Sequence, residues 1–187
     1  MDMKDLMYSE IDQLGRDFIK TKIKDNILNS ECIIKKIFEK CAKSRGTQHL
    51  TPFECISLAE ALMHYLLAIT ITPSQRKIKI NNIEISIFVP SAGGLKYGGD
   101  KVLVIQFLKE GKIENEHTVS SLLEIQPTVD NIWLVSHSPV VTLFQLKNFV
   151  INTQSIGTNE LVQPFSRLMI QIIAFLNKIN YTGFRIL

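Results

Sequence analysis

The stretch from Lys101 to Thr142 constrains the fold of this chain more than any other part of it. It reads KVLVIQFLKEGKIENEHTVSSLLEIQPTVDNIWLVSHSPVVT. Val102–Leu108 is apolar apart from Gln106, which is typical of a strand covered on both faces. Thr118–Ile125 carries apolar residues at helical spacing, and Ile132–Val135 is a second apolar run. Two buried strands joined by such a helix indicate a parallel βαβ unit with a right-handed crossover.

The part of the chain before residue 73 has the spacing of helices. Apolar residues three and four apart predict a first helix from Met3 to about Leu28 and a second that follows Asn29-Ser30. A third helix begins after Thr51, because Thr51 can accept the Glu54 amide hydrogen bond while the Glu54 carboxylate reaches back to Thr51. This third helix is apolar nearly all round, so we expect it to be buried on more than one side.

The remaining segments predict strands and one long helix. Arg76–Ile80 and Ile83–Val89 alternate in polarity around Asn81-Asn82, which indicates a β-hairpin with a type I′ turn. The glycine-rich segment Pro90–Gly99 then forms a loop. Beyond the βαβ unit the pattern predicts a helix over Val140–Lys147, a strand over Phe149–Asn152, an amphipathic helix over Phe165–Ile179 and an edge strand over Tyr181–Leu187.

This order of elements predicts an α/β chain of the mixed α+β kind in three parts. Residues 1–72 form a helical N-terminal part, residues 73–164 form an α/β core with a small mixed sheet, and residues 165–187 form a C-terminal helix and short strand. The αβββαβ order of the core resembles the restriction-endonuclease-like fold. A resemblance of fold does not by itself assign a function.

Composition and charge limit the classes of partner. The 187 residues carry a net charge of +3, which permits a local phosphate contact but is far from that of proteins held on nucleic acid mainly by charge. The three cysteines have no CxxC spacing, which favours buried thiols in a reduced intracellular chain.

The acidic, polar N-terminus is not expected to act as a signal peptide. The apolar segments Leu58–Ile71 and Leu168–Ile179 are too short or interrupted to span a bilayer, so no membrane contact is expected. The frequent Ile, Lys and Asn suggest an AT-rich genome. We therefore expect a nuclear location or, for a viral protein, the cytoplasm or the virion.

A nuclease site is the first chemistry that this fold suggests. Metal-dependent nucleases of the PD-(D/E)xK type place an Asp on the second core strand, and an acidic residue, one further position and a Lys on the third. Here Gln106 stands in the position of the acid and Leu108 in that of the Lys. A divergent nuclease would use Glu84, Asp100 and Gln106 around Mg²⁺. Otherwise these residues are exposed groups at strand ends, and neither metal nor cofactor is expected.

Two further features are candidates for binding. The loop Gly93–Gly99, with Lys96 inside it and Lys101 just after it, could contact phosphate through backbone N–H groups. It lacks the GxxxxGK[ST] pattern and leads into a strand, so a surface loop is the default interpretation. His137 and Ser138 lie at the carboxyl end of the second central strand, where open α/β sheets bind ligands. Without a GxSxG elbow, a turn with Ser138 as helix cap is the simpler interpretation.

Several short segments resemble the N-terminal jaw domain of the fifth subunit of eukaryotic-type DNA-directed RNA polymerases. That domain has the endonuclease-like fold without its active site. The similar segments are Ile34–Lys40 with Ser44-Arg45-Gly46, Thr51–Glu54, Asp130–Pro139, and Thr158–Pro164, in which Asn159 and Gln163 depart from the family. The resemblance implies contact with a larger protein complex, and the candidates for partner or nucleic-acid contact are Lys96, Lys101, Ser138, Glu160 and Pro164.

The sequence therefore supports three hypotheses. The first is a non-catalytic subunit or interaction domain of a nucleic-acid-processing complex, most similar to an RNA polymerase jaw subunit, with weak or indirect DNA contact. The second is the divergent nuclease. The third is a protein-interaction adaptor. The last helix bears on this choice, because its apolar face packs either inside the domain or against a partner, and we expect Leu168, Ile172 and Phe175 or Leu176 to face inward.

Overall fold

The computed structural model describes residues 3–44, 49–109, 112–140 and 145–183, and its centre is a mixed six-stranded sheet. Neighbouring strands in the sheet are also neighbours in the sequence. The strands are β1 (Gln75–Ile80), β2 (Ile83–Val89), β3 (Leu103–Phe107), β4 (Ile132–Ser136), β5 (Lys147–Val150) and β6 (Val162–Pro164). The first three pair antiparallel, and β3 to β6 pair parallel. The small mixed sheet expected from the sequence is confirmed.

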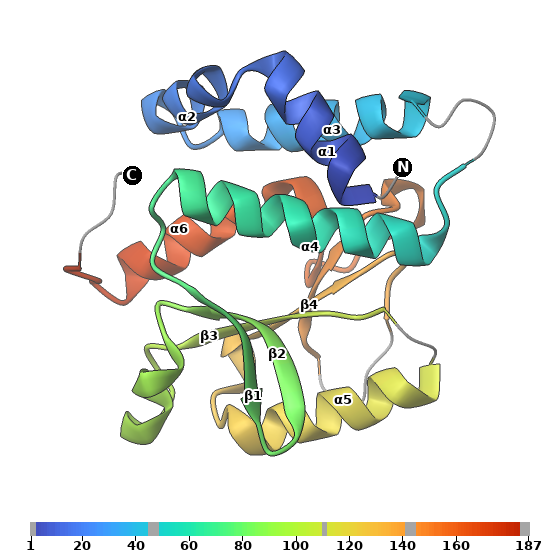
Figure 1. Ribbon diagram of the computed structural model, residues 1–187. Helices are drawn as coiled ribbons and strands as arrows, with labels where there is room; N and C mark the ends of the chain where they lie inside the picture. Colours follow the sequence, from blue (N-terminus) through green and yellow to red (C-terminus); the bar gives the residue numbers. More distant parts are fainter. Residues whose placement is uncertain (1–2, 45–48, 110–111, 141–144, 184–187) are drawn as a thin grey trace.

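Helices cover both faces of this sheet (Figure 1). Most of them lie on one face, whereas α5 covers the other. The helices are α1 (Met3–Leu14), α2 (Arg16–Asp25), α3 (Asn29–Ser44), α4 (Pro52–Ile69), α5 (Lys112–Ile125) and α6 (Leu168–Lys178). Short 3-10 turns are η1 (Ala92–Tyr97), η2 (Val129–Asn131), η3 (Thr153–Ser155) and η4 (Phe165–Arg167). Two hydrophobic cores result, one on each side of the sheet.

The predicted βαβ unit is β3–α5–β4. Its two strands pair parallel, with Val104 opposite Ile132 and Gln106 opposite Leu134. Side chains along β3 alternate between the two cores, since Val104 belongs to the core under α5 and Ile105 to the core under α4. Strand β3 is therefore covered on both faces, as the sequence predicted.

The β1–β2 hairpin is also as predicted. Ile80 pairs with Ile83 across Asn81-Asn82, and both asparagines have positive φ, 49° and 65°. A type I′ turn requires this left-handed conformation at both central residues, and asparagine tolerates it better than most residues.

Four parts of the local structure differ from the prediction or extend beyond it. The helix expected from Met3 to Leu28 is two helices, because Gly15 adopts φ +87° and ends α1. Strand β6 was not expected within the segment Thr158–Pro164. Residues 145–146 are not helical and Lys147 begins β5, while residues 141–144 of the expected Val140–Lys147 helix lie outside the described residues. In the expected final strand, residues 181–183 are not in a strand and residues 184–187 lie outside the described residues.

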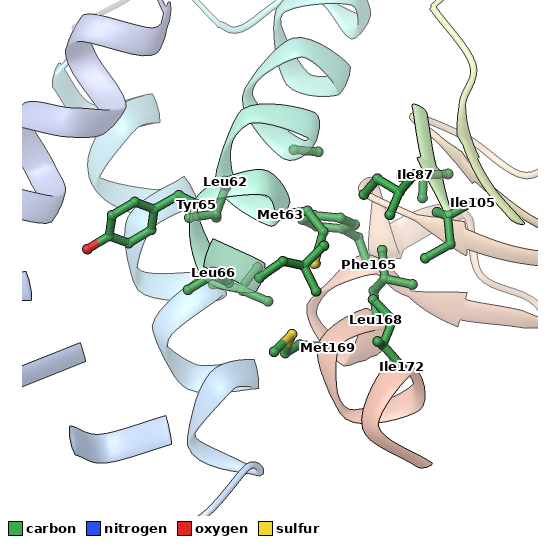
Figure 2. Packing of buried hydrophobic residues seen from close by; sticks show 14 of the residues in the cluster. Leu62, Met63, Tyr65, Leu66, Ile87, Ile105, Phe165, Leu168, Met169 and Ile172 are labelled. Carbon is green, nitrogen blue, oxygen red and sulfur yellow. The ribbon is translucent and has the colours of Figure 1, made fainter. Parts of the chain in front are cut away.

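Helix α4 is the central helix of the larger core. Ten of its residues are buried, among them Met63, Leu66 and Leu67, because α1 and α3 cover one side and the sheet lies on the other. Figure 2 shows Met63 between α4 and the group of Phe165, Leu168 and Ile172. By length and composition alone α4 could also cross a membrane, but burial as a core helix explains the same apolar character.

The start of α4 has the capping box expected from the sequence. The Glu54 backbone N–H donates to Thr51 Oγ1 at 3.2 Å, and the Thr51 backbone N–H donates to Glu54 Oε2 at 2.9 Å. We expect Thr51→Ala to lower the free energy of unfolding by about 1 kcal/mol, the usual effect of losing such a cap. Urea denaturation measures this, and a Thr51→Ser variant, which keeps the hydroxyl, should unfold near the wild-type midpoint.

The three cysteines are free thiols. Cys41 and Cys55 are buried as expected, and burial raises the pKa of the Cys41 thiol to about 11. Cys32 lies on the exposed side of α3, so the expectation of buried thiols was wrong for this residue.

Candidate functional site

The pairing of β2 with β3 changes character at Ser86 and Gln106. Backbone pairing runs from Val89–Leu103 to Ile87–Ile105. At the next position, Ser86 and Gln106, side-chain hydrogen bonds replace the backbone pairing. The Ser86 N–H donates to Gln106 Oε1 at 3.1 Å, and the Phe107 N–H donates to Ser86 Oγ at 3.3 Å. Gln106 Nε2 also donates to the Glu84 carbonyl oxygen at 3.4 Å. The two strands are therefore held together here by side chains.

A pocket of about 230 Å³ lies at this end of the two strands. Helix α4, strands β2 and β3, the segment after β3 and helix α5 all contribute to it. Its lining consists of Glu60, Ile83, Glu84, Ser86, Gln106, Phe107, Leu108, Lys109 and Thr118. The pocket is below the size of about 300–1,000 Å³ that drug-sized ligands usually need, so it suits a small charged group.

An ion pair between Glu60 and Lys109 lies in the pocket. Lys109 Nζ donates to Glu60 Oε2, and the Glu60 side chain is only 8% exposed, against 32% for Lys109. A buried carboxylate on an otherwise apolar helix needs such a partner, because an unpaired charge is costly to bury. Successive side chains of an extended segment point to opposite faces of the sheet. Leu108 belongs to the core that α5 covers, so the next side chain, Lys109, points back toward α4 and can reach Glu60.

His64 lies one helical turn after Glu60 on α4. Burial lowers the pKa of His64, and it outweighs the opposing effect of the Glu60 carboxylate. Its Nε2 is buried and has no hydrogen-bond partner among the residues that the structure describes. A hydrogen bond with the Ser86 backbone also raises the pKa of His64, but by less than burial lowers it.

Of the three residues of the nuclease hypothesis, Glu84 and Gln106 meet in this pocket and Asp100 does not. Asp100 precedes β3, whereas Glu84 is the second residue of β2 and Gln106 the last but one of β3. Because β2 and β3 are antiparallel, Asp100 lies at the opposite end of the strand pair. There its Oδ1 accepts a hydrogen bond from Thr128 Oγ1 at 2.9 Å.

Glu60 and Lys109 were not among the candidates from the sequence. The third-strand motif directs attention to the second residue after the acid position, which is the buried Leu108. Lys109 follows it, and Glu60 comes from a helix 49 residues earlier. One available signal was the carboxylate of Glu60 in the interior of a helix that is apolar nearly all round, since such a charge is rarely buried without a function or a partner.

The five candidates for partner or nucleic-acid contact do not form one surface. Lys96, in η1, and Lys101 are exposed at the end of the sheet where β3 begins, away from the pocket. Ser138 follows β4, where its carbonyl accepts from Ser136 Oγ at 2.7 Å. Pro164 ends β6, opposite Val150.

Glu160 lines a second pocket of about 430 Å³, at the amino ends of β4 and β5. Lys147 is its most distinctive residue: Nζ lies 4.7 Å from the centre of the Trp133 ring and donates to Gln171 Oε1 at 2.7 Å. Burial lowers the pKa of Lys147. With acidic and basic groups both on its wall, this pocket does not favour one class of ligand.

The first pocket can supply oxygen ligands for Mg²⁺. Among the residues that the structure describes, no group of three His, Cys, Asp or Glu side chains is placed to hold a metal ion. Mg²⁺, however, commonly binds through one or two carboxylates together with water and substrate phosphates. Glu60 and Glu84 offer these two carboxylates, so the residues present fit Mg²⁺ bound jointly with a phosphate.

Comparison with known proteins agrees with this fold. No family model matches the sequence, and no curated protein does either. Among solved structures, metal-depleted Ecl18kI in complex with uncleaved, modified DNA has a TM-score of 0.65 at 12% identity, over 98% of this chain and 81% of that chain. A second Ecl18kI complex, with uncleaved DNA, gives 0.61 at 14% identity, over 98% and 82%.

A complex of the restriction endonuclease PspGI with substrate DNA gives a TM-score of 0.55 at 14% identity, over 95% of this chain and 94% of that chain. None of these three structures is a polymerase subunit, so they support the endonuclease-like part of the sequence resemblance and not the polymerase part. At 12–14% identity they show the fold alone. The chain has the restriction-endonuclease-like fold.

Proposed function

We propose that this protein is a divergent metal-dependent nuclease that acts on DNA in the pocket between α4, β2 and β3. The observation that carries the proposal is the meeting of Glu60, Glu84 and Lys109 in one pocket. Two carboxylates can hold Mg²⁺ together with a substrate phosphate, and a lysine can stabilise charge on that phosphate. The restriction-endonuclease-like fold and the DNA complexes of the three similar structures add support from analogy.

Each residue has a distinct role in the proposed reaction. Glu60 and Glu84 would hold Mg²⁺, which supplies an activated water and stabilises charge on the phosphate when it is bound. Lys109 Nζ would stabilise the negative charge that grows on the phosphate oxygens. Gln106 positions Glu84 through its hydrogen bonds to the β2 backbone.

The ion pair between Glu60 and Lys109 keeps both groups in the pocket before the substrate binds. A phosphate bound beside Lys109 would take over as its negative partner. Glu60 would then be released to serve as a metal ligand. In this proposal, substrate binding would be coupled to assembly of the metal site.

Nicking of supercoiled plasmid DNA tests the proposal. Wild-type protein should nick the plasmid in the presence of Mg²⁺ or Mn²⁺, and the reaction should stop when EDTA is added. Glu60→Gln and Glu84→Gln should each lower the rate at least about 100-fold, the scale for loss of one electrostatic group in an active site. Asp100→Asn is the matched control, because it removes a carboxylate at the other end of the strands, and it should cut like wild type. Equal activity of all three variants would contradict the proposal.

A second candidate is a DNA-binding protein of the same fold without catalysis. The amide of Gln106, in the position of the missing third-strand acid, is occupied on both sides by the β2 backbone. This arrangement is structural and favours a non-catalytic role. Wild-type protein that binds DNA but does not nick it would support this candidate, above all if Gln106→Glu then gained metal-dependent cutting. A polymerase subunit among the proteins that co-purify with the tagged chain would instead favour the jaw-like subunit.

A further inference from the structure

Strand β1 forms the exposed edge of the sheet beside the first pocket. Among the described strands it pairs with β2 alone, and it lies at the end of the strand order (Figure 1). In this hairpin Lys79 is opposite Glu84 and Ile80 is opposite Ile83, and both Ile83 and Glu84 line the pocket. The outer strand of the hairpin therefore runs directly alongside the pocket.

The exposed residues of β1 are strongly basic. Arg76, Lys77 and Lys79 are all exposed, and none of them takes part in the ion pairs found between described residues. Arg76 Nη1 donates to the His64 carbonyl oxygen at 3.3 Å. Residues 61–83 contain no Asp or Glu. Three cations on one strand, with Glu84 opposite Lys79 as the acidic residue on the neighbouring strand, give this edge a local positive field that the small net charge of the chain does not reveal.

The backbone of β1 is irregular at the centre of this basic group. Lys77 adopts φ +54° and is missing from the β1–β2 register, whereas Arg76 and Ile78 are paired. A positive φ on a residue other than glycine is uncommon, and such irregularities concentrate beside functional sites, where they redirect side chains. The opposite residue is Ser86, whose N–H is directed to Gln106 in the pocket. The irregular residue Lys77 therefore lies directly across the hairpin from Ser86, which lines the pocket.

The spacing of these cations suits a nucleic-acid backbone. An extended strand rises by about 3.3 Å per residue, so Arg76 and Lys79 are roughly 10 Å apart along β1. Phosphates on one strand of duplex DNA advance by about 3.4 Å each along the helix axis. The basic edge therefore spans about three phosphate steps.

We propose that β1 binds the phosphate backbone of duplex DNA through Arg76, Lys77 and Lys79, and so holds the substrate across the pocket. This inference rests on the proposed function, since it names how the substrate of the same site is held. An alternative role for basic residues on an edge strand is to prevent pairing with the edge of another molecule. The two roles predict different results, because the first changes the salt dependence of DNA binding and the second changes aggregation.

Binding of a fluorescein-labelled duplex of about 30 base pairs, in EDTA so that no cleavage occurs, tests this inference. The affinity is measured by anisotropy between about 50 and 200 mM salt. Each lost phosphate contact lowers the slope of log K against log salt by about 0.9, so the triple variant Arg76→Gln/Lys77→Gln/Lys79→Gln should lose about 2 to 3 from the slope. The control is Lys20→Gln/Lys22→Gln/Lys24→Gln, which changes the charge equally on the exposed face of α2, on the far side of the helical layer (Figure 1).

Equal salt slopes for wild type and the β1 variant would overturn the inference. Equal losses of slope in the β1 and α2 variants would also overturn it, because they would show that binding depends on the total charge and not on β1. Stronger binding of single-stranded RNA than of the duplex would also overturn it. If the β1 variant aggregates on size-exclusion chromatography, the single variant Lys79→Gln replaces it, with an expected slope loss of about 0.9. If wild-type protein binds DNA and the β1 variant shows the same salt slope, only this inference is rejected. If the wild type binds no DNA at any salt concentration, the proposed function is rejected as well.

Discussion

Replacing Ile172 by aspartate is expected to unfold the protein. Ile172 is fully buried on α6, in the core that also contains Met63 of α4 and Ile105 of β3 (Figure 2). The shorter change Ile172→Ala should already lower the free energy of unfolding by about 2–5 kcal/mol, the range for removing a large buried aliphatic side chain. Aspartate adds an unpaired carboxylate in an apolar site. The sum approaches the whole stability of a typical domain, about 5–15 kcal/mol.

Ala174→Asp is the matched control on the same helix, because Ala174 is exposed and two residues away. It should leave the thermal unfolding midpoint close to that of wild type. A stable, cooperatively folded Ile172→Asp variant would show that this face of α6 is not core. The sequence left open whether α6 packs inside the domain or against a partner, and the burial of Leu168, Ile172, Phe175 and Leu176 confirms the inward-facing group.

Replacing Lys109 by glutamine is expected to have two large effects. The rate of plasmid nicking should fall by about 100- to 1,000-fold, because the proposed site loses the cation that stabilises charge on the phosphate. The free energy of unfolding should also fall by about 1–3 kcal/mol, since Glu60 is left buried without its partner. This is below the 3–5 kcal/mol of a fully buried pair, because water still reaches about a third of the Lys109 side chain.

The double variant Glu60→Gln/Lys109→Gln separates the two effects. Urea denaturation should show it more stable than Lys109→Gln alone, because no unpaired charge remains in the pocket. Its nicking activity should stay as low as that of the single variants. Recovery of activity together with stability would mean that Lys109 acts only through folding, and the catalytic role would have to be abandoned.

Individual residues show why the sequence predicted some parts of the site and missed others. Gln106 and Glu84 were found because each stands at a fixed position in an apolar strand, and neighbouring strands bring such positions together. Asp100 was included for its closeness in sequence to β3, but it precedes that strand, while Glu84 lies near the start of the antiparallel strand β2. Lys109 was passed over because the motif points to Leu108, which alternation places in the core under α5.

The sequence by itself determined the elements whose cause is local. The capping box at Thr51 starts α4, the turn Asn81-Asn82 closes the hairpin, and the apolar run before Leu108 forms a strand buried on both faces. In each case neighbouring residues supply the hydrogen bonds, the backbone conformation or the apolar surface. Only the tertiary structure decided that Glu60 and Lys109, 49 residues apart, share one pocket. Their meeting depends on how α4 packs across the sheet, and that packing is the result of many distant apolar contacts acting together.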